Sequence, residues 1–336
     1  MTFSGRPSGP GSAVWPITFQ DVLAARERLS PFLPKTPLRS YPALDEAVGG
    51  GIRVLVKHEN HNPTNSFKAR NGLSLVSALP EATRRRGLVA ATRGNHGLGL
   101  AWAGSLLGAR VTICVPKGNN PEKNEAMRGF GVELIEGGRD YDEVVRTADA
   151  LRAERGLHLA HSTNDPTVIA GAATLTLEIL EETRRIDALV IGVGGGSQAV
   201  GAMVAARELR PNLKVYGVQA ERASAIHDSW HQGHPVSRDS ADTFADGLAT
   251  RNAYEMTFPA LRAGLEGFVT VSEAEIAAAL RLLLRTTHNL AEGAGAAGLA
   301  GLIRLREALA GRTVGVVLSG GNIDSGTLRR VLTGEL

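Results

Sequence analysis

Several features that mark specialised proteins are absent or scarce in this chain of 336 residues. It has one cysteine, Cys114, so no disulfide can form within the chain. No apolar run approaches the roughly 20 residues of a transmembrane helix, and we expect no membrane span. An excess of one charge is also lacking, since 37 basic and 34 acidic residues are well mixed and leave a net charge of +3. This balance argues against a nucleic-acid partner and against binding to an acidic membrane surface.

The scarce elements also bear on location and order. Cys114 lies inside the apolar run 111–115 without an activating pattern, so we predict a buried structural cysteine. Residues 1–16 are rich in glycine, serine and proline and contain no apolar signal core. We therefore expect a flexible leader over residues 1–16 and a cytoplasmic protein.

The chain does contain a regular alternation of short β-branched runs and longer amphipathic segments. Such alternation predicts an α/β fold of open, mostly parallel sheets covered by helices on both faces. Because about nine strands exceed one comfortable core, we expect two domains. The predicted strands are 53–57, 88–91, 110–115, 132–135, 188–193, 214–219, 268–271 and 313–318. The predicted helices include 141–155, 171–185 and 273–288, and the stretch 226–252 is expected to be irregular.

Three glycine-rich loops, 92–97, 194–197 and 319–322, each follow a predicted strand. In open parallel sheets, ligands bind at the carboxyl ends of the strands, against helix N-termini. The loop 194–197 can point consecutive N–H groups at one anion such as a phosphate. It lacks the ending of a nucleotide P-loop and the spacing of a dinucleotide loop. A tight turn that needs glycine for packing is the alternative.

The loop 92–97 forms a second junction between a strand and a helix. Its small polar residues suit a substrate carboxylate, although for this loop taken alone an ordinary helix N-cap, with Asn95 bonded locally, is the favoured explanation.

Lys68 is the candidate reactive residue, in the run 62–72 of small polar residues. Phe67 before it could bury the lysine stem and lower the pKa of the amine. Such an amine serves both as nucleophile and as general base. The alternative is an ordinary solvated surface lysine.

A histidine group offers a weaker signal for a metal. His227, His231 and His234 have helical spacing, but Gly233 and Pro235 interrupt that helix. A solvated loop is the favoured explanation, and we predict no metal site.

Together these motifs resemble the fold-type II pyridoxal-phosphate (PLP) enzymes, within them the serine/threonine dehydratase and serine racemase branch. The resemblance extends from about residue 37 to 323. The family pattern Ser-Phe-Lys-x-Arg-Gly is matched from Ser66 to Asn71, Gly-Asn-His from Gly94 to His96, and Ser-Gly-Gly-Asn from Ser319 to Asn322. The family's tetraglycine loop corresponds to 194–197, and segments 165–171 and 245–248 also match.

The resemblance implies a cofactor, a division into domains and a reaction. Lys68 would form a Schiff base with PLP and then remove the Cα proton of an amino-acid substrate. Residues 17–83 and 163–336 would form a large PLP-binding domain, and residues 84–162 a small domain that closes on the substrate.

The same resemblance implies a set of binding residues. Asn95 would bond the 3′-oxygen of the cofactor, and Ser319 would face its pyridine nitrogen as a neutral hydroxyl, which suits β-elimination. The implied cofactor-binding residues are Phe67, Lys68, Asn95, Gly194, Gly195, Gly196, Ser197, Glu292 and Ser319. The implied substrate-binding residues are Thr92, Arg93, Gly94, Asn95 and His96.

Three departures from the family pattern are informative. Glu292 is kept, but it is followed by Gly293-Ala294 instead of Pro-Ser/Thr-Gly. At the family's metal position, Gln219 replaces a glutamate and Ala225 an aspartate. Arg93 stands where racemases carry an acid–base serine, and arginine is a poor acid–base group at neutral pH.

The expected function is therefore a PLP-dependent ammonia-lyase. It would convert a β-hydroxy-α-amino acid, similar to threonine or serine, to a 2-oxo acid and ammonia. Arg93 also admits 3-hydroxyaspartate or an aryl-serine as substrate. The alternatives are an amino-acid racemase of the serine/aspartate type and, less favoured, a small-molecule binding protein. The resemblance implies a homodimer, and we expect no regulatory domain after the final motif.

Overall fold

The computed structural model describes residues 14–138 and 141–336. The predicted leader therefore lies outside the described residues, apart from its last three positions. Of these, Trp15 lies beneath the Arg207 guanidinium, 4.2 Å from its carbon to the ring centroid. No helix in the described ranges is long and apolar enough to cross a membrane.

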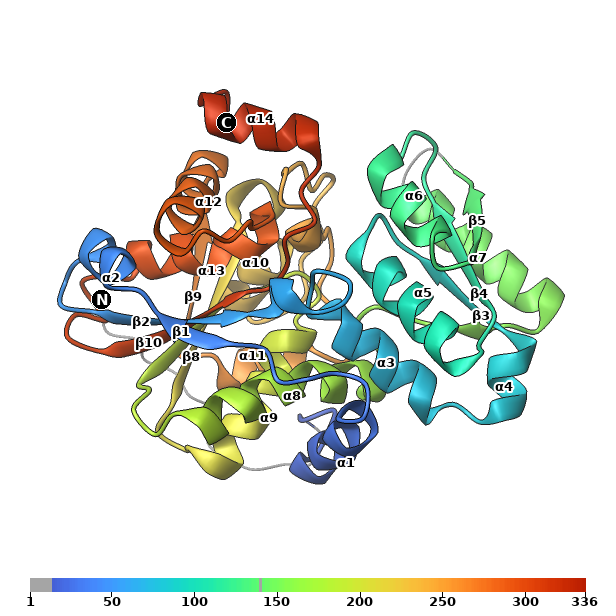
Figure 1. The fold of residues 1–336 in the computed structure, drawn as a ribbon, viewed down its shortest axis with the longest axis horizontal. Coiled ribbons are helices and arrows are strands. Elements are labelled where there is room, and N and C mark those ends of the chain that lie inside the picture. Colours follow the sequence, from blue (N-terminus) through green and yellow to red (C-terminus); the bar gives the residue numbers. More distant parts are fainter. Residues whose placement is uncertain (1–13, 139–140) are drawn as a thin grey trace.

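The larger of two sheets has six strands in the order β1-β2-β10-β7-β8-β9 (Figure 1). Only β1 runs antiparallel to its neighbour, and the other pairs are parallel. The strands are β1 (Leu38–Ser40), β2 (Arg53–His58), β7 (Ala188–Gly192), β8 (Lys214–Ala220), β9 (Gly267–Val271) and β10 (Thr313–Leu318).

Helices cover both faces of this sheet, because successive strand residues point to opposite sides. Val54 and Val56 face one apolar core, whereas Leu55 between them faces the other. The first core is closed by α2 (Pro42–Val48), α12 (Glu273–Thr287), α13 (Gly293–Arg304) and α14 (Ser325–Thr333). The second is closed by α1 (Phe19–Leu29), α8 (Pro166–Glu182), α9 (Ser197–Leu209), α10 (Ala225–Gln232) and α11 (Phe258–Gly264).

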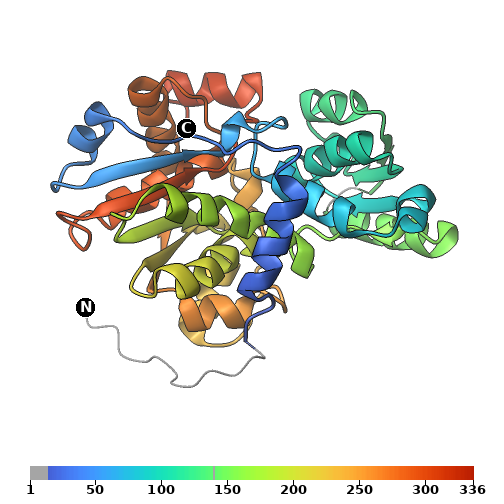
Figure 2. The ribbon, with the colours of Figure 1, turned by 60° about the horizontal axis from the view of Figure 1, so that its bottom comes forward.

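The smaller sheet is fully parallel, in the order β5-β4-β3-β6. Its strands are β3 (Leu88–Ala91), β4 (Val111–Val115), β5 (Glu133–Glu136) and β6 (His158–Leu159). The helices around it are α4 (Glu81–Arg86), α5 (Asn95–Leu107), α6 (Pro121–Arg128) and α7 (Tyr141–Arg155). Helix α3 (Lys68–Ala78) packs against α5, α8 and α1, and so joins the two parts (Figure 2).

The predicted fold class is confirmed, and each predicted strand overlaps an observed one. The two short strands β1 and β6 were missed, since three or two residues carry no periodic signal. Cys114 is buried in β4, and burial raises the pKa of its thiol to about 11, as expected of an inert cysteine.

Two predicted element boundaries were wrong. The stretch 226–252 is not irregular throughout, because α10 occupies its start and ends at Gly233, whose φ is 82°. Helix α8 begins at Pro166, five residues before the predicted start. Asp165 caps it by accepting hydrogen bonds from the N–H groups of Thr167 and Val168, a start signal that apolar periodicity alone does not show.

Candidate active site

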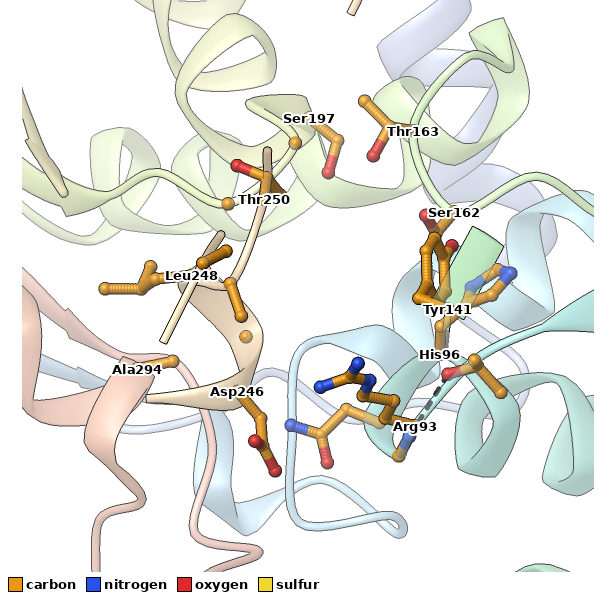
Figure 3. A pocket seen from close by; sticks show the side chains of 18 of the residues that line it. Arg93, His96, Tyr141, Ser162, Thr163, Ser197, Asp246, Leu248, Thr250 and Ala294 are labelled. Carbon is orange, nitrogen blue, oxygen red and sulfur yellow. Dashed lines mark hydrogen bonds between the residues drawn. The ribbon is translucent and has the colours of Figure 1, made fainter. Parts of the chain in front are cut away.

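A cavity of about 580 Å³ lies between the carboxyl ends of strands from both sheets (Figure 3). Every residue predicted for the site lines it. These residues are Phe67, Lys68, Thr92, Arg93, Gly94, Asn95, His96, Gly194, Gly195, Gly196, Ser197, Glu292 and Ser319.

The loop 194–197 begins with three glycines at positions where a side chain would clash or be strained. A Cβ on Gly194 would lie 2.1 Å from the Gly247 carbonyl oxygen, and one on Gly195 would lie 1.9 Å from Thr163 Oγ1. Gly196 has φ +95° and directly precedes α9. The first N–H groups of a helix have no acceptor within it, so this loop offers them to an anion.

Polar side chains gather at the same end of the cavity. Figure 3 places the hydroxyls of Ser197 and Thr163 close together there. Gln198 Nε2 is buried beside them without a hydrogen-bond partner among the described residues. An uncompensated buried donor is costly, so this end of the cavity fits a phosphate group.

Lys68 is the first residue of α3 and extends into the cavity from the side of Phe67. Its Nζ lies 4.9 Å from the centroid of the Phe67 ring and 3.4 Å from the carbonyl oxygen of Ser162, to which it donates. Burial lowers the pKa of Lys68 to about 8, against the opposing effect of the Glu292 carboxylate. The amine is therefore far more often neutral near pH 8 than an ordinary lysine is.

Asn95 is fixed at the wall by two side chains. It donates from Nδ2 to Glu292 Oε1 at 2.6 Å, and it accepts at Oδ1 from Asn322 Nδ2 at 2.7 Å. Burial raises the pKa of Glu292 to about 7, with Asp246 adding to that rise and Lys123 opposing it. Asn322, the last residue of the Ser-Gly-Gly-Asn motif, thus holds the position of Asn95. The Ser319 carbonyl accepts the N–H of Phe67 at 2.9 Å and ties the same motif to the lysine segment.

The loop 92–96 closes the opposite end. The Gly94 N–H donates to Thr92 Oγ1 at 3.1 Å, the dashed line in Figure 3. His96 is buried and pairs through Nε2 with the Ala160 carbonyl at 2.8 Å. Burial, together with the charge on Lys68, lowers the pKa of His96 to about 3, so its ring is neutral.

Arg93 differs from its neighbours in this loop. Its guanidinium points toward the middle of the cavity in Figure 3. Within residues 14–138 and 141–336, no carboxylate pairs with it. It lies near Tyr141, since its charge partly offsets the effect of burial, which raises the pKa of that phenol.

Two ion pairs join the parts of the chain across the rim of the cavity. Lys123 in α6 pairs with Asp246, and Asp142 in α7 pairs with Arg251. No sequence pattern predicts either pair, because the partners are more than a hundred residues apart. The segment 245–248 was noted only as similar to the family.

Further cavity residues were missed as well. His161, Ser162, Thr163, Tyr141 and Tyr254 come from three separate segments, and none of them forms a recognisable motif. Only their proximity in the fold shows that they share one wall.

Two of the three spaced histidines, His227 and His231, lie together with ring centroids 4.4 Å apart, whereas His234 Nδ1 lies 3.2 Å from the Pro235 carbonyl oxygen. His227 Nδ1 contacts Asp228 at 3.2 Å, and His231 Nε2 lies 3.4 Å from the Phe268 carbonyl. Across the described part of the chain, no group of three or more histidine, cysteine or acidic residues could hold a metal.

The chain matches the family model described as "Pyridoxal-phosphate dependent enzyme" over residues 29–320. It is 35% identical to an L-threonine ammonia-lyase of Thermotoga maritima over 94% of this chain and 78% of that protein. It is 34% identical to an L-threo-3-hydroxyaspartate ammonia-lyase of Pseudomonas sp, over 91% and 96%. The fold resembles that of a threonine deaminase from T.th., with TM-score 0.86 and 35% identity, over 92% and 99% of the two chains.

A racemase also resembles it, but less closely in sequence. The serine racemase of Dictyostelium discoideum gives TM-score 0.85 at 28% identity, over 92% and 99%. The chain belongs to the PLP-dependent enzyme family. Within that family it is an ammonia-lyase, a lyase that uses pyridoxal 5′-phosphate.

Proposed function

We propose that this ammonia-lyase dehydrates a β-hydroxy-α-amino acid that carries a second carboxylate, with L-threo-3-hydroxyaspartate as the favoured substrate. The products are a 2-oxo acid and ammonia. The observation that carries this choice is the Arg93 guanidinium, which faces the cavity without a carboxylate partner among the described residues. Two relatives, from Pseudomonas sp and Saccharomyces cerevisiae, are named for this substrate.

The residues of the cavity have separate tasks in this reaction. Gly194 to Ser197 would hold the cofactor phosphate, and Phe67, Asn95, Glu292 and Ser319 would lie around its ring. When bound, pyridoxal phosphate supplies an electron sink that acidifies the Cα proton of the amino acid. Lys68 would hold the cofactor until the substrate amine displaces it, and the freed Nζ would then take that proton, for which its lowered pKa suits it. The backbone of residues 92–96 binds the α-carboxylate.

Arg93 can bind a second carboxylate through two parallel hydrogen bonds, because the guanidinium presents a planar fork of donors. Figure 3 places it at the end of the cavity away from Ser197. With the cofactor phosphate at the loop 194–197, the side chain of the substrate would point to the end of the cavity at which Arg93 lies. An aryl-serine is the other candidate substrate that Arg93 could bind, by stacking of the guanidinium on the aromatic ring instead of pairing with a carboxylate.

L-Threonine is the second candidate. Val145, Ala148 and Leu159 give the cavity an apolar part that suits a methyl group. The T. maritima relative is named for this substrate. Arg93 would then face outward to solvent.

Racemisation is the alternative reaction, and Arg93 argues against it. A racemase needs an acid–base group on each side of Cα, and a guanidinium keeps its proton at neutral pH. We therefore propose elimination without racemisation.

The test compares kcat/KM for L-threonine, L-threo-3-hydroxyaspartate and phenylserine in the wild type, Arg93→Ser and Arg93→Lys. We expect Arg93→Ser to lower kcat/KM for hydroxyaspartate by about 10- to 100-fold, the value of a hydrogen-bonded charge pair. Threonine should change by less than about threefold. Arg93→Lys keeps the charge without the fork and should fall between the two. An unchanged ranking with no gain of racemisation would show that Arg93 does not select the substrate.

Assembly, domain division and location complete the proposal. We propose a cytoplasmic homodimer in which residues 84–162 form a small domain that closes on the substrate. The contacts of Lys123 with Asp246 and of Asp142 with Arg251 support such closure, since both cross from one part to the other. Light scattering in solution tests the dimer.

A further inference from the structure

His161 lies between β6 and α8, and its ring nitrogens have different surroundings. Its Nδ1 accepts hydrogen bonds from the backbone N–H groups of Thr163 at 2.9 Å and Asn164 at 2.8 Å. A nitrogen that accepts carries no proton, so the neutral ring is protonated at Nε2. The loop geometry thus selects one tautomer.

The Nε2–H group is free to meet a substrate. His161 lines the cavity, and within the described residues no hydrogen bond is formed by its Nε2. Its ring meets that of Tyr254 edge to face, with centroids 5.9 Å apart. This contact, with the two bonds to Nδ1, fixes the plane of the ring.

The same ring lies beside the reacting lysine. Ser162, the next residue, accepts from Lys68 Nζ through its carbonyl oxygen at 3.4 Å. Burial lowers the pKa of His161, and the charge on Lys68 adds to this against the opposing Asp165. The ring is therefore neutral at pH 7, a hydrogen-bond donor and not an acid.

We propose that His161 donates a hydrogen bond from Nε2 to the β-oxygen of the substrate and stabilises the charge that gathers there as the C–O bond breaks. This rests on the proposed dehydration. In that step Lys68 takes the Cα proton, the Cα–H electron pair forms the Cα–Cβ double bond, and the C–O pair leaves with the oxygen. The oxygen takes up the proton that Lys68 Nζ has carried from Cα and departs as water, so no further proton donor is needed. His161 keeps its own proton throughout.

Two substitutions separate the roles of the two ring nitrogens. In His161→Asn, Oδ1 can replace Nδ1 as the acceptor for the loop, but the donor at the Nε2 position is lost. In His161→Gln, Nε2 replaces the donor while the acceptor is lost. Each variant is assayed with L-serine and with 3-chloro-L-alanine, because chloride leaves without needing a hydrogen-bond donor.

We expect His161→Asn to lower kcat/KM for L-serine by about 10- to 100-fold, the value of a hydrogen bond to a charged atom. Elimination of chloride by the same variant should change by less than about threefold. His161→Gln should retain the wild-type ratio of the two substrates. Equal losses on both substrates in His161→Asn, or a changed ratio in His161→Gln as large as in His161→Asn, overturn the inference and leave the proposed function standing.

A wild-type enzyme that eliminates chloride but no β-hydroxyl group overturns the proposed function and the inference with it. A second readout does not depend on turnover. Long-range ¹H–¹⁵N spectra of histidine-labelled enzyme at pH 7 should contain the signal of a ring protonated at Nε2 alone that vanishes in His161→Asn, whereas the corresponding signal of His96 should remain. If the signal that vanishes belongs to a ring protonated at Nδ1, or at both nitrogens, the inference is contradicted.

Discussion

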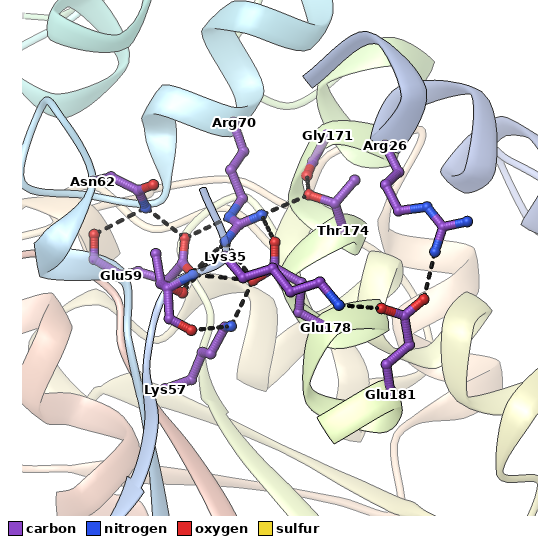
Figure 4. A network of polar contacts seen from close by, with 11 residues as sticks. Arg26, Lys35, Lys57, Glu59, Asn62, Arg70, Gly171, Thr174, Glu178 and Glu181 are labelled. Atoms are coloured by element: carbon purple, nitrogen blue, oxygen red, sulfur yellow. Dashed lines mark hydrogen bonds and ion pairs between the residues drawn. The ribbon is translucent and has the colours of Figure 1, made fainter. Parts of the chain in front are cut away.

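Lys57 and Lys68 lie close in sequence, yet their surroundings are opposite. Lys57 is completely buried, and its Nζ donates to Glu178 at 2.6 Å and to the Thr36 carbonyl at 2.8 Å (Figure 4). Lys68 opens onto the cavity, and its one hydrogen bond to a described residue is the 3.4 Å contact with a carbonyl. A charge that is matched within the fold stabilises structure, whereas an unmatched one is available for chemistry.

The arginines show the same contrast. Arg70 is buried two residues after Lys68 and contacts Glu59 through Nε at 2.7 Å and Glu178 through Nη1 at 2.6 Å. Arg93 faces the cavity without such a partner among the described residues. The network around Arg70 also holds α3, the helix that begins at Lys68, against α8 (Figure 4). The buried ion pairs of Arg70 therefore fix the position of the helix from which Lys68 extends into the cavity.

Removing the unmatched charge should have the largest effect. Lys68→Ala should abolish turnover and leave no covalently attached cofactor, because no other lysine lines the cavity in the described part of the chain. Mass spectrometry after borohydride reduction should place the pyridoxyl group of the wild type on Lys68. Circular dichroism of the variant should show an intact fold. A label on any other lysine contradicts the assignment.

Removing a matched charge should instead affect stability. Glu178→Gln leaves Arg70 and Lys57 with one fewer carboxylate in a buried site, and we expect a loss of about 3–5 kcal/mol in the free energy of unfolding. Glu181→Gln is the matched control on the same helix. Glu181 pairs with Arg26 and Lys35 at the surface, where such pairs contribute about 0–1 kcal/mol. Urea unfolding measures both, and equal losses would contradict the distinction.

The sequence predicted the cavity residues, such as Lys68, better than it predicted the buried network around Lys57 and Arg70. Apolar runs predict the strands. The glycine loops were predicted because only a residue without a side chain fits where the backbone is crowded, and a Cβ added to Gly194 or Gly195 would lie about 2 Å from a neighbouring atom. Lys68 stood out because its motif is local. Such features can be predicted from the sequence because the residues that determine them lie within a few positions of one another.

The buried network could not be predicted in the same way. Lysine and glutamate are mostly exposed in proteins, so the sequence gives no reason to expect Lys57, Glu59 and Glu178 to be buried. Nothing in the neighbouring sequence distinguishes Glu178 from Glu181. Their burial depends on how α8 packs against α3, which is a tertiary property. The cavity wall of His161 and Tyr254 was missed for the same reason, since its members come from different segments.

The contrast between the lysines can be sharpened by pH. Because the pKa of Lys68 is lowered to about 8, its unprotonated fraction, and hence its rate of attachment to added cofactor, should rise about tenfold from pH 7 to pH 9 and then level. A lysine at the ordinary value of 10.5 would continue to rise above pH 9. The visible absorbance of the attached cofactor measures the rate after removal and re-addition of PLP.

Glu292→Gln provides the control for this measurement. The Glu292 carboxylate raises the pKa of Lys68 against the effect of burial, so its removal should shift the midpoint of the pH profile downward. A rate that still climbs between pH 9 and pH 10.5 in the wild type would show that Lys68 is not desolvated.

The smallest expected effect concerns a neutral buried residue. Gln219 is fully buried, and it occupies the position at which the resemblance to the family implies a metal-site glutamate. Its Oε1 accepts from the His227 N–H at 2.9 Å, and its Nε2 donates to Thr250 Oγ1 at 3.3 Å. Mg²⁺ and Ca²⁺ prefer several hard oxygen ligands, among them carboxylates, and here the amide oxygen is already engaged while Ala225 supplies no side-chain oxygen. Like Lys57, Gln219 has its polar atoms hydrogen-bonded within the chain. Exhaustive chelation should therefore leave kcat within about twofold of the kcat of the untreated enzyme. A large loss that Mg²⁺ restores, and that an equal ionic strength of monovalent salt does not, would show that other oxygens hold a divalent cation that activity requires.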